Sequence, residues 1–493
     1  MATLARLPNE ILALILGRFC LHCCEARETR ETPDVFVPPS GHDEQGEPTW
    51  DWDGHQVLYS ACLVSARLRD IAQPILYHEF IPGYGHPCRR LIPFVRTVAL
   101  RRDLAAAVRR VQVHYDSRAI PPGGLGAVFE EAARARAIEL PAFLAPFRHR
   151  WARAWPKYAY TPAGDELITM LLACLPNLAR LIVAAASLFG DIPASALQAA
   201  GVERLPLQTC DASGYFAPSR VADILNMARR TLTTLNLDGC DAVTVCTLAR
   251  AVIPGLPRLR NLCITKTPLT GSNLALLLSC CAGLESFILE ARKSSCPLGS
   301  AQPSAILPPG AVEHLLGHRE TLKTLRLDCH VPYSAGRMPS EDEVLVFRTD
   351  LMPQLRRFPV LQDLFLNLAI VYGGEDEDEE GSSSSTSSSS IPLDQCLPQS
   401  IVSLSLADNV TAPRRLARLA EDLSRLQLAA ASGEFPHLRK IRLDAEEFVD
   451  DDNLAALFAG AGVDFAYAAM PLSNGLSRGQ LRLPPRSWGF ASS

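Results

Sequence analysis

Cysteine and histidine side chains gather near the N-terminus, at Cys20, His22, Cys23 and Cys24. Thiolate and imidazole groups are the usual ligands of Zn²⁺, and a structural zinc site holds four of them in a tetrahedron. Such a site needs a second pair of ligands at a suitable spacing. His42 and His55 follow along the chain, but no pair here has a recognised zinc spacing. The sequence therefore predicts no metal site.

The motifs of common catalytic sites do not occur in this chain. It has no glycine-rich loop ending in Gly-Lys-Ser/Thr, no His-Glu-x-x-His and no Gly-x-Ser-x-Gly. We predict no catalytic residue and no cofactor. An enzyme that uses an exposed cysteine remains an alternative, and it would require a thiol with unusual reactivity at neutral pH.

Composition narrows the possible partners and the compartment. The formal net charge is −5, whereas nucleic-acid binding usually needs a basic patch or stripe. No run of 18 apolar residues occurs, so we expect no membrane span. Fifteen cysteines in 493 residues are too sparse for a disulfide scaffold and fit a reducing compartment. We expect a cytoplasmic or nuclear protein that binds neither nucleic acid nor membrane.

Two amphipathic segments near the N-terminus share one kind of pattern. The first opens with LPNEIL at Leu7 and continues to Phe19, which predicts a helix that begins at a proline. The second is LYSACLVSARLRDIAQPILYHEF from Leu58. Residues 20 to 56 separate them and are rich in charge, proline and glycine, which predicts a surface loop. Two or three short helices bury little surface alone, so this module needs a partner.

The Leu-Pro-x-Glu-Ile start and the later Val64-Ser65-x-Arg67-Leu68-Arg69 resemble an F-box. In this chain Leu68 stands where that family often has tryptophan, and the motif is interrupted rather than compact. The resemblance implies docking on a Skp-type adaptor of a cullin–RING ubiquitin ligase, with the chain as substrate receptor. The implied adaptor-binding residues are Leu7, Pro8, Glu10, Ile11, Ile15, Leu58, Val64, Ser65 and Leu68.

The rest of the chain carries an internal repeat of the form apolar-x-x-apolar-x-apolar. Ten copies begin at Val108, Leu178, Val202, Leu232, Leu259, Leu284, Leu322, Leu361, Ile401 and Leu438. Offsets are 24 to 30 residues between Leu178 and Leu284, and 37 to 40 residues afterwards. Helix-like apolar runs precede the copies, as in RVADILNMARR and RRLARLAEDLSRL. A short strand and a helix per unit predict units that stack into a solenoid with parallel strands.

This α/β architecture resembles a leucine-rich-repeat horseshoe of the longer, helix-containing type, with the parallel sheet on the concave face. Positions four and six of each copy should be buried, and positions three, five and seven should line the concave face. In the copy at Val202 those exposed positions are Arg204, Pro206 and Gln208. The candidate substrate-binding residues are Asp238, Glu290, Asp328, Asp444, Ile288, Phe365 and Arg326. The acidic column would favour a basic partner segment, with Ile288 and Phe365 as apolar anchors.

We therefore predict a helical module at residues 1–80, interrupted at 20–56, a repeat solenoid at 88–470 and a C-terminal tail at 471–493. The acidic and serine-rich run at 373–390 predicts a disordered insertion within the solenoid. The function that follows is a non-catalytic substrate receptor, which binds the adaptor and cullin–RING core with the module and an unknown protein substrate with the repeats. A plain repeat scaffold without a ubiquitin role is the alternative. It would be favoured if residues 20 to 56 kept the two halves of the module apart.

Overall fold

The computed structural model describes residues 6–20, 22–23, 50–81, 87–115, 125–151, 163–185, 192–214, 219–240, 255–265, 267, 271–291, 311–329, 352–372, 392–407, 413–444 and 451–467. The chain divides into two compact units, one of residues 1–34 and 38–259 and one of residues 35–37 and 260–493. The predicted insertion at 373–390 and tail at 471–493 lie outside the described residues. The predicted domain boundaries stay a prediction.

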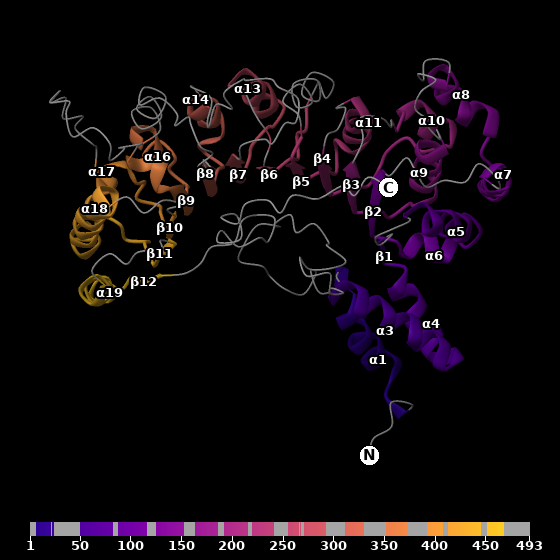
Figure 1. Cartoon of the computed structure of the whole chain (residues 1–493), viewed down its shortest axis with the longest axis horizontal. Helices are drawn as coiled ribbons and strands as arrows, with labels where there is room; N and C mark the ends of the chain where they lie inside the picture. The colour runs from indigo at the N-terminus through magenta and orange to yellow at the C-terminus, as the bar shows by residue number, and fades with distance from the viewer. Residues whose placement is uncertain are drawn as a thin grey trace, which may run out of the picture. The chain divides into compact units, whose positions relative to one another are not determined.

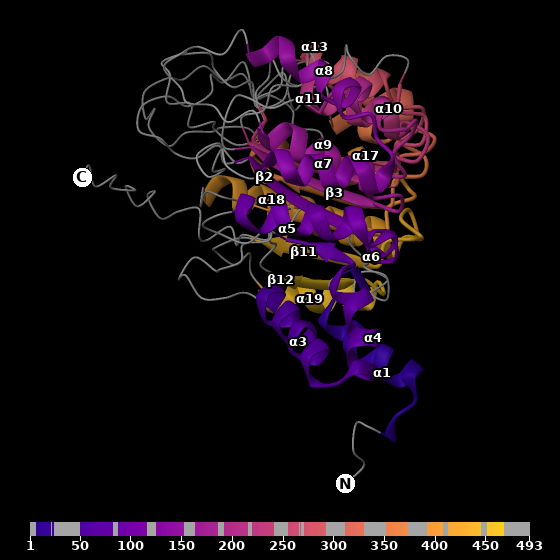
Figure 2. The same ribbon diagram turned by 90° about the vertical axis from the view of Figure 1, so that its right-hand side faces the viewer.

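The first unit begins with short helices. These are α1 (Asn9–Leu16), η2 (Gly17–Phe19), α3 (Trp50–Val64) and α4 (Ala66–Leu76). Helix α1 starts one residue after the proline, since Pro8 is its N-cap and accepts the Leu12 amide. Helix α3 starts at Trp50, so the predicted loop at 20–56 is wrong at its C-terminal end: residues 50–56 form two turns that bring Gly54 against Phe19. Helices α3 and α4 lie side by side (Figures 1 and 2).

Five parallel strands complete the sheet of the first unit, in chain order. They are β1 (Glu79–Phe80), β2 (Arg110–Tyr115), β3 (Arg180–Ala185), β4 (Thr209–Gly214) and β5 (Thr234–Asp238). The helices between them are α5 (Pro87–Leu100), α6 (Arg102–Ala107), α7 (Leu125–Arg136), α8 (Leu140–Trp151), α9 (Ala163–Cys174), α10 (Ala194–Ala199) and α11 (Ser219–Ala228). The two-residue strand β1 joins the helical module to this sheet by pairing with β2.

The second unit repeats the same alternation. Its strands are β6 (Asn261–Thr265), β7 (Ser286–Ala291), β8 (Thr324–Cys329), β9 (Asp363–Asn367), β10 (Ser403–Ala407), β11 (Lys440–Asp444) and β12 (Asp464–Tyr467). Its helices are α13 (Gly271–Ser279), α14 (Ala311–Leu315), η3 (Leu316–His318), α16 (Leu368–Tyr372), α17 (Leu393–Cys396), α18 (Pro413–Ala431) and α19 (Asp451–Gly460). In Figure 1, α13 and α14 lie along one face of the strands β6 to β8.

Equivalent positions of neighbouring repeat copies lie side by side in the sheet. Leu325 of β8 lies beside Phe287 of β7 and Leu364 of β9, and all three are buried, as position four of each copy requires. A parallel ladder keeps equivalent positions side by side because each strand re-enters the sheet after its crossover helix. The predicted α/β repeat solenoid with parallel strands is therefore confirmed.

One repeat copy is misplaced by the sequence pattern. The copy at Val202 predicts a strand through Arg204 and Pro206, but β4 starts at Thr209, and it is Thr209 that pairs with Arg180 and Thr234. Leu205 and Leu207 are buried in the segment that leads into the strand. The apolar positions of β4 are Cys210 and Ala212, which are small enough to escape a search for large aliphatic residues.

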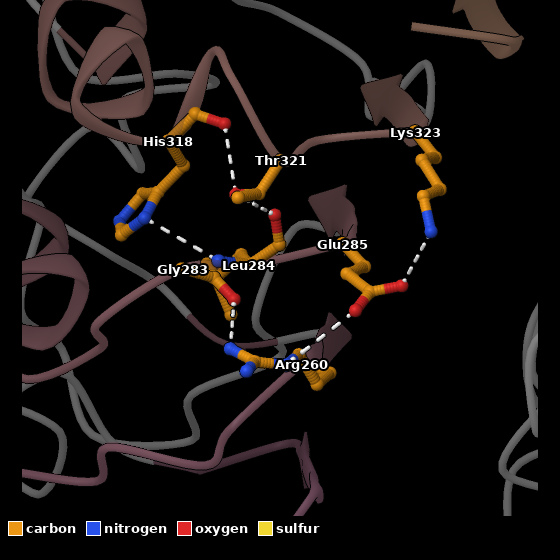
Figure 3. A network of polar contacts seen from close by, with 7 residues as sticks. All are labelled: Arg260, Gly283, Leu284, Glu285, His318, Thr321 and Lys323. Atoms are coloured by element: carbon orange, nitrogen blue, oxygen red, sulfur yellow. Dashed lines mark hydrogen bonds and ion pairs between the residues drawn. The ribbon is translucent and has the colours of Figure 1, made fainter. Parts of the chain in front are cut away.

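A network of polar contacts fixes the turns between β6, β7 and β8 (Figure 3). Thr321 Oγ donates to the carbonyls of Leu284, at 2.7 Å, and His318, at 3.1 Å, while Glu285 pairs with Arg260 and Lys323. The His318 ring is buried and its Nδ1 accepts the Leu284 amide at 3.4 Å. The ring therefore takes part in this network as a neutral acceptor.

This histidine gives the second unit a pH-dependent stability. Burial lowers the pKa of His318 below its ordinary value of 6.5. As pH falls below about 6.5, the unfolded chain binds a proton that the folded chain does not, so the free energy of unfolding should fall. We expect urea unfolding to show this loss as pH falls through the ordinary histidine pKa of about 6.5 and below it. At the higher pH, His318→Asn should have a lower free energy of unfolding than the wild type. Its free energy of unfolding should also change much less with pH. A variant with the wild-type pH dependence would show that His318 is not its source.

Candidate functional site

The two halves of the interrupted N-terminal motif share one hydrophobic core. Its fully or nearly fully buried members are Leu16, Cys20, Leu58, Ala72 and Ile75. Leu16 comes from the first half, Cys20 is the first residue of the interruption at 20–56, and the other three come from after it. A methyl group on Gly54 of α3 would stand 2.7 Å from the Phe19 carbonyl oxygen, so the helix approaches η2 as closely as only glycine allows. The interruption does not separate the halves.

Polar contacts also tie the halves together. Arg67 of α4 donates from Nε to Asn9 Oδ1 at 2.8 Å and from Nη2 to the Leu7 carbonyl. Ser65 is the N-cap of α4 and accepts the Leu68 amide at 3.1 Å. Thus Leu7, Asn9, Ser65 and Arg67 fix the start of α1 against the start of α4.

This small module exposes an unusual amount of apolar surface. Ten large apolar side chains are exposed in the part of the chain that the structure describes, and seven of them lie between residues 11 and 64: Ile11, Leu14, Ile15, Val57, Tyr59, Leu63 and Val64. Leu63 and Val64 are 70% and 71% exposed. Scattered apolar residues are normal on a surface, but this concentration on two short helices makes the module a candidate interaction surface.

The predicted adaptor-binding residues divide between this surface and the core. Ile11, Ile15 and Val64 are exposed, together with the polar or small Pro8, Glu10 and Ser65. Leu7 and Leu68 are half-buried, and Leu68 packs against the core. Leu58 is fully buried, so its side chain supports the fold of the module. Leu63, which the sequence reasoning did not include, is among the most exposed.

The strand-face residues of the second unit are brought together, but several have partners within the protein. Arg326 pairs with the buried Glu290 at 3.1 Å and its guanidinium lies 4.3 Å from the centre of the Phe365 ring. The buried Asp328 accepts from Asn367 at 3.3 Å. Internal pairing of this kind compensates the buried charges and leaves less charge for a partner.

The remaining strand-face candidates differ in exposure. Ile288 and Phe365 are buried, while Asp444 is half-buried at the end of β11. Asp238, also half-buried, belongs to the first unit. Their role in substrate binding stays a prediction.

Sequence reasoning missed a buried ion pair in the first unit. Asp211 of β4 is fully buried, accepts from Arg180 Nε of β3 at 2.8 Å and accepts from Asn236 of β5. Arg180, Asp211 and Asn236 lie on three adjacent strands. In the register of the sheet, Asp211 lies beside Asn236 on one side and beside Ile182, two residues after Arg180, on the other. The misplaced copy at Val202 hid Asp211, which falls at position five once the strand is read from Thr209.

None of the helices in the described ranges is both long and apolar enough to span a membrane. Comparison with known proteins finds no matching family profile and no matching curated protein. Among solved structures, the chain is similar to a chain in the crystal structure of the Rad7 and Elc1 complex in yeast. The two are 13% identical with a TM-score of 0.32, over 82% of this chain and 90% of that one. Values this low do not establish a shared fold.

Proposed function

We propose that this protein is a non-catalytic substrate receptor of a Skp–cullin–F-box type ubiquitin ligase, acting in the cytoplasm or nucleus. The observation that carries the proposal is the N-terminal module: the halves of a motif that resembles an F-box fold into one core and leave Ile11, Ile15 and Val64 exposed. The alternative, a scaffold without a ubiquitin role, would have been favoured if residues 20 to 56 had held the halves apart.

The exposed apolar side chains supply the energy for adaptor binding. Burying apolar surface stabilises a complex by about 25 cal/mol per Å² before the costs of association are subtracted. Leu63 and Val64, at the end of α3, have the most surface left to bury. A Skp-type adaptor with an apolar groove is the partner that this surface and the sequence resemblance jointly favour.

The repeats would hold a protein substrate while the ligase core holds a ubiquitin-charged enzyme. Such a receptor accelerates transfer by proximity, because an encounter between two free molecules becomes a local event within one complex. No side chain of this chain takes part in the chemistry. The acidic column predicted from the sequence would favour a basic substrate segment on the strand face.

The test is direct binding of the purified full-length chain to a purified Skp-type adaptor. We expect a complex of one chain with one adaptor in size-exclusion chromatography, and its retention when a cullin is added. An adaptor that elutes free at high concentrations of both proteins would contradict the proposal and leave the repeat scaffold as the better description.

A further inference from the structure

Four metal-ligand side chains from distant parts of the sequence meet beside the N-terminal core. Cys20 follows η2, His22 and Cys23 come directly after it, and His78 lies in the turn between α4 and β1. One ligand atom from each of the four lies within 4.8 Å of those of the other three. Cys20 is fully buried and the other three are half-buried, so the cluster is largely shielded from solvent.

Distances within the cluster match those across a tetrahedral zinc. With Zn–S near 2.3 Å and Zn–N near 2.0–2.1 Å, a sulfur and a nitrogen ligand lie about 3.6 Å apart. His78 Nδ1 is 3.7 Å from Cys20 Sγ and 3.4 Å from Cys23 Sγ. His22 Nδ1 is 3.9 Å from Cys23 Sγ. The imidazole rings of His22 and His78 lie edge to face with centres 5.1 Å apart, and the Nδ1 atom of each ring lies near Cys23 Sγ.

A buried carboxylate next to the cluster is only partly satisfied by hydrogen bonds. Glu79 is 4% exposed; its Oε1 accepts from the His22 amide and from Cys20 Sγ, the latter at 3.3 Å. Its Oε2 has no hydrogen-bond partner among the described residues. A buried carboxylate is costly unless a cation or hydrogen bonds compensate it. Metal binding would remove the proton that Cys20 donates to Oε1. The charge of the metal and the His22 amide, rather than the Cys20 thiol, would then stabilise the Glu79 carboxylate.

We propose that Cys20, His22, Cys23 and His78 form a structural Zn²⁺ site that closes the interrupted helical module. Two sulfur and two nitrogen ligands are a donor set typical of structural zinc, and four protein ligands leave no open position for catalysis. This departs from the absence of a metal site predicted from sequence, because His78 lies 55 residues beyond Cys23 and no local spacing connects them.

The position of the site explains what it would do for the fold. The first three ligands stand at the end of the first half of the motif, where the interruption begins. His78 is attached to the sheet, since its carbonyl accepts the amides of Arg109 and Arg110 at 2.8 and 2.9 Å. A zinc ion would therefore fasten the first half of the module to the strand that starts the repeats, across the stretch that separates the two halves in sequence.

Metal content and cobalt substitution of the full-length chain test this site. We expect about one zinc per purified chain, and after its exchange for Co²⁺ the absorption of a tetrahedral cobalt centre with thiolate ligands. Cys23→Ala and His78→Ala should lose both signals. His78→Cys, which keeps four donors, should retain them. Cys62→Ser is the matched control, because Cys62 is a half-buried cysteine that packs against the same core outside the cluster.

Two results would overturn the proposal. One is a folded wild-type chain that holds below about a tenth of an equivalent of zinc even after incubation with ZnCl₂. The other is rapid alkylation of Cys23 that added zinc does not slow, which would identify the cluster as a reactive thiol instead. Neither measurement uses the adaptor, so failure here is distinct from failure of the proposed ligase function.

Discussion

Replacing Leu63 and Val64 together with serine should weaken adaptor binding by on the order of a hundredfold while leaving the fold intact. Full burial of such side chains contributes about 1.5–3 kcal/mol each, so loss of both costs about 3 kcal/mol of binding energy. Both side chains are more than two-thirds exposed in the free chain, and surface substitutions change stability by about 0.5 kcal/mol or less. Titration calorimetry against the adaptor and thermal unfolding measure the two effects separately.

The matched control is Leu428→Ser on α18 of the second unit. Leu428 is 67% exposed, nearly as much as Leu63, but it lies far from the module in sequence and in the other unit. It should bind the adaptor like the wild type. Equal losses in both variants would show that general surface apolarity, not the module, drives association. Undiminished binding of the double variant would remove α3 from the adaptor surface.

Leu58 lies on the same helix as Leu63 and Val64, but we expect it to support folding rather than adaptor binding. It is fully buried between the two halves of the motif, so Leu58→Ala should lower the stability of the module, as large-to-small changes in cores cost about 2–5 kcal/mol. Reduced adaptor binding in that variant would therefore follow from unfolding. The sequence resemblance assigned both Leu58 and Val64 to adaptor binding. In the structure the Leu58 side chain is buried in the core and the Val64 side chain is exposed, so only Val64 is available to a partner.

Periodicity predicted the repeat fold well because the physical constraint is local. Leu325 and Leu327 alternate with polar residues on a strand buried on one face, and that alternation is visible in six residues. It failed at β4, where Cys210 and Ala212 fill the core positions and the larger Leu205 and Leu207 are buried in the preceding turn. Burial there depends on the size of the space between neighbouring strands, which no local pattern contains.

The candidate sites were harder to predict because their residues are joined by the fold and not by spacing. His78 lies near Cys20 and Cys23 because α4 packs against α1 and β1 pairs with β2. Arg67 could be assigned to the motif from sequence, but its bonds to Leu7 and Asn9 required the structure. The sequence motif was enough to predict the module. The role of each side chain in it could be assigned only from its packing in the structure.

Asp211→Ala should destabilise the first unit by about 3–5 kcal/mol, the cost of removing one partner from a buried ion pair. Asp211 is fully buried, and the Arg180 side chain is 12% exposed, so the guanidinium would keep its charge with little access to water. Asn236 would lose its acceptor as well. Urea unfolding followed by circular dichroism should show a lower midpoint, and Asp464→Ala is the control, because Asp464 pairs with Arg442 at a site where its side chain is 66% exposed. That change should leave the unfolding midpoint almost unchanged, because water screens an exposed ion pair.

A double variant distinguishes two causes of this instability: loss of the attraction between Arg180 and Asp211, and the cost of a buried Arg180 charge that has lost its Asp211 partner. Replacing Arg180 with methionine and Asp211 with leucine removes both charges, and apolar replacement of a buried pair is often neutral or stabilising. We expect Arg180→Met with Asp211→Leu to recover most of the stability that Asp211→Ala loses. A double variant as unstable as the single one would instead mean that Asp211 acts mainly through Asn236 of β5, and that the central strands of the first unit depend on this hydrogen bond rather than on the ion pair.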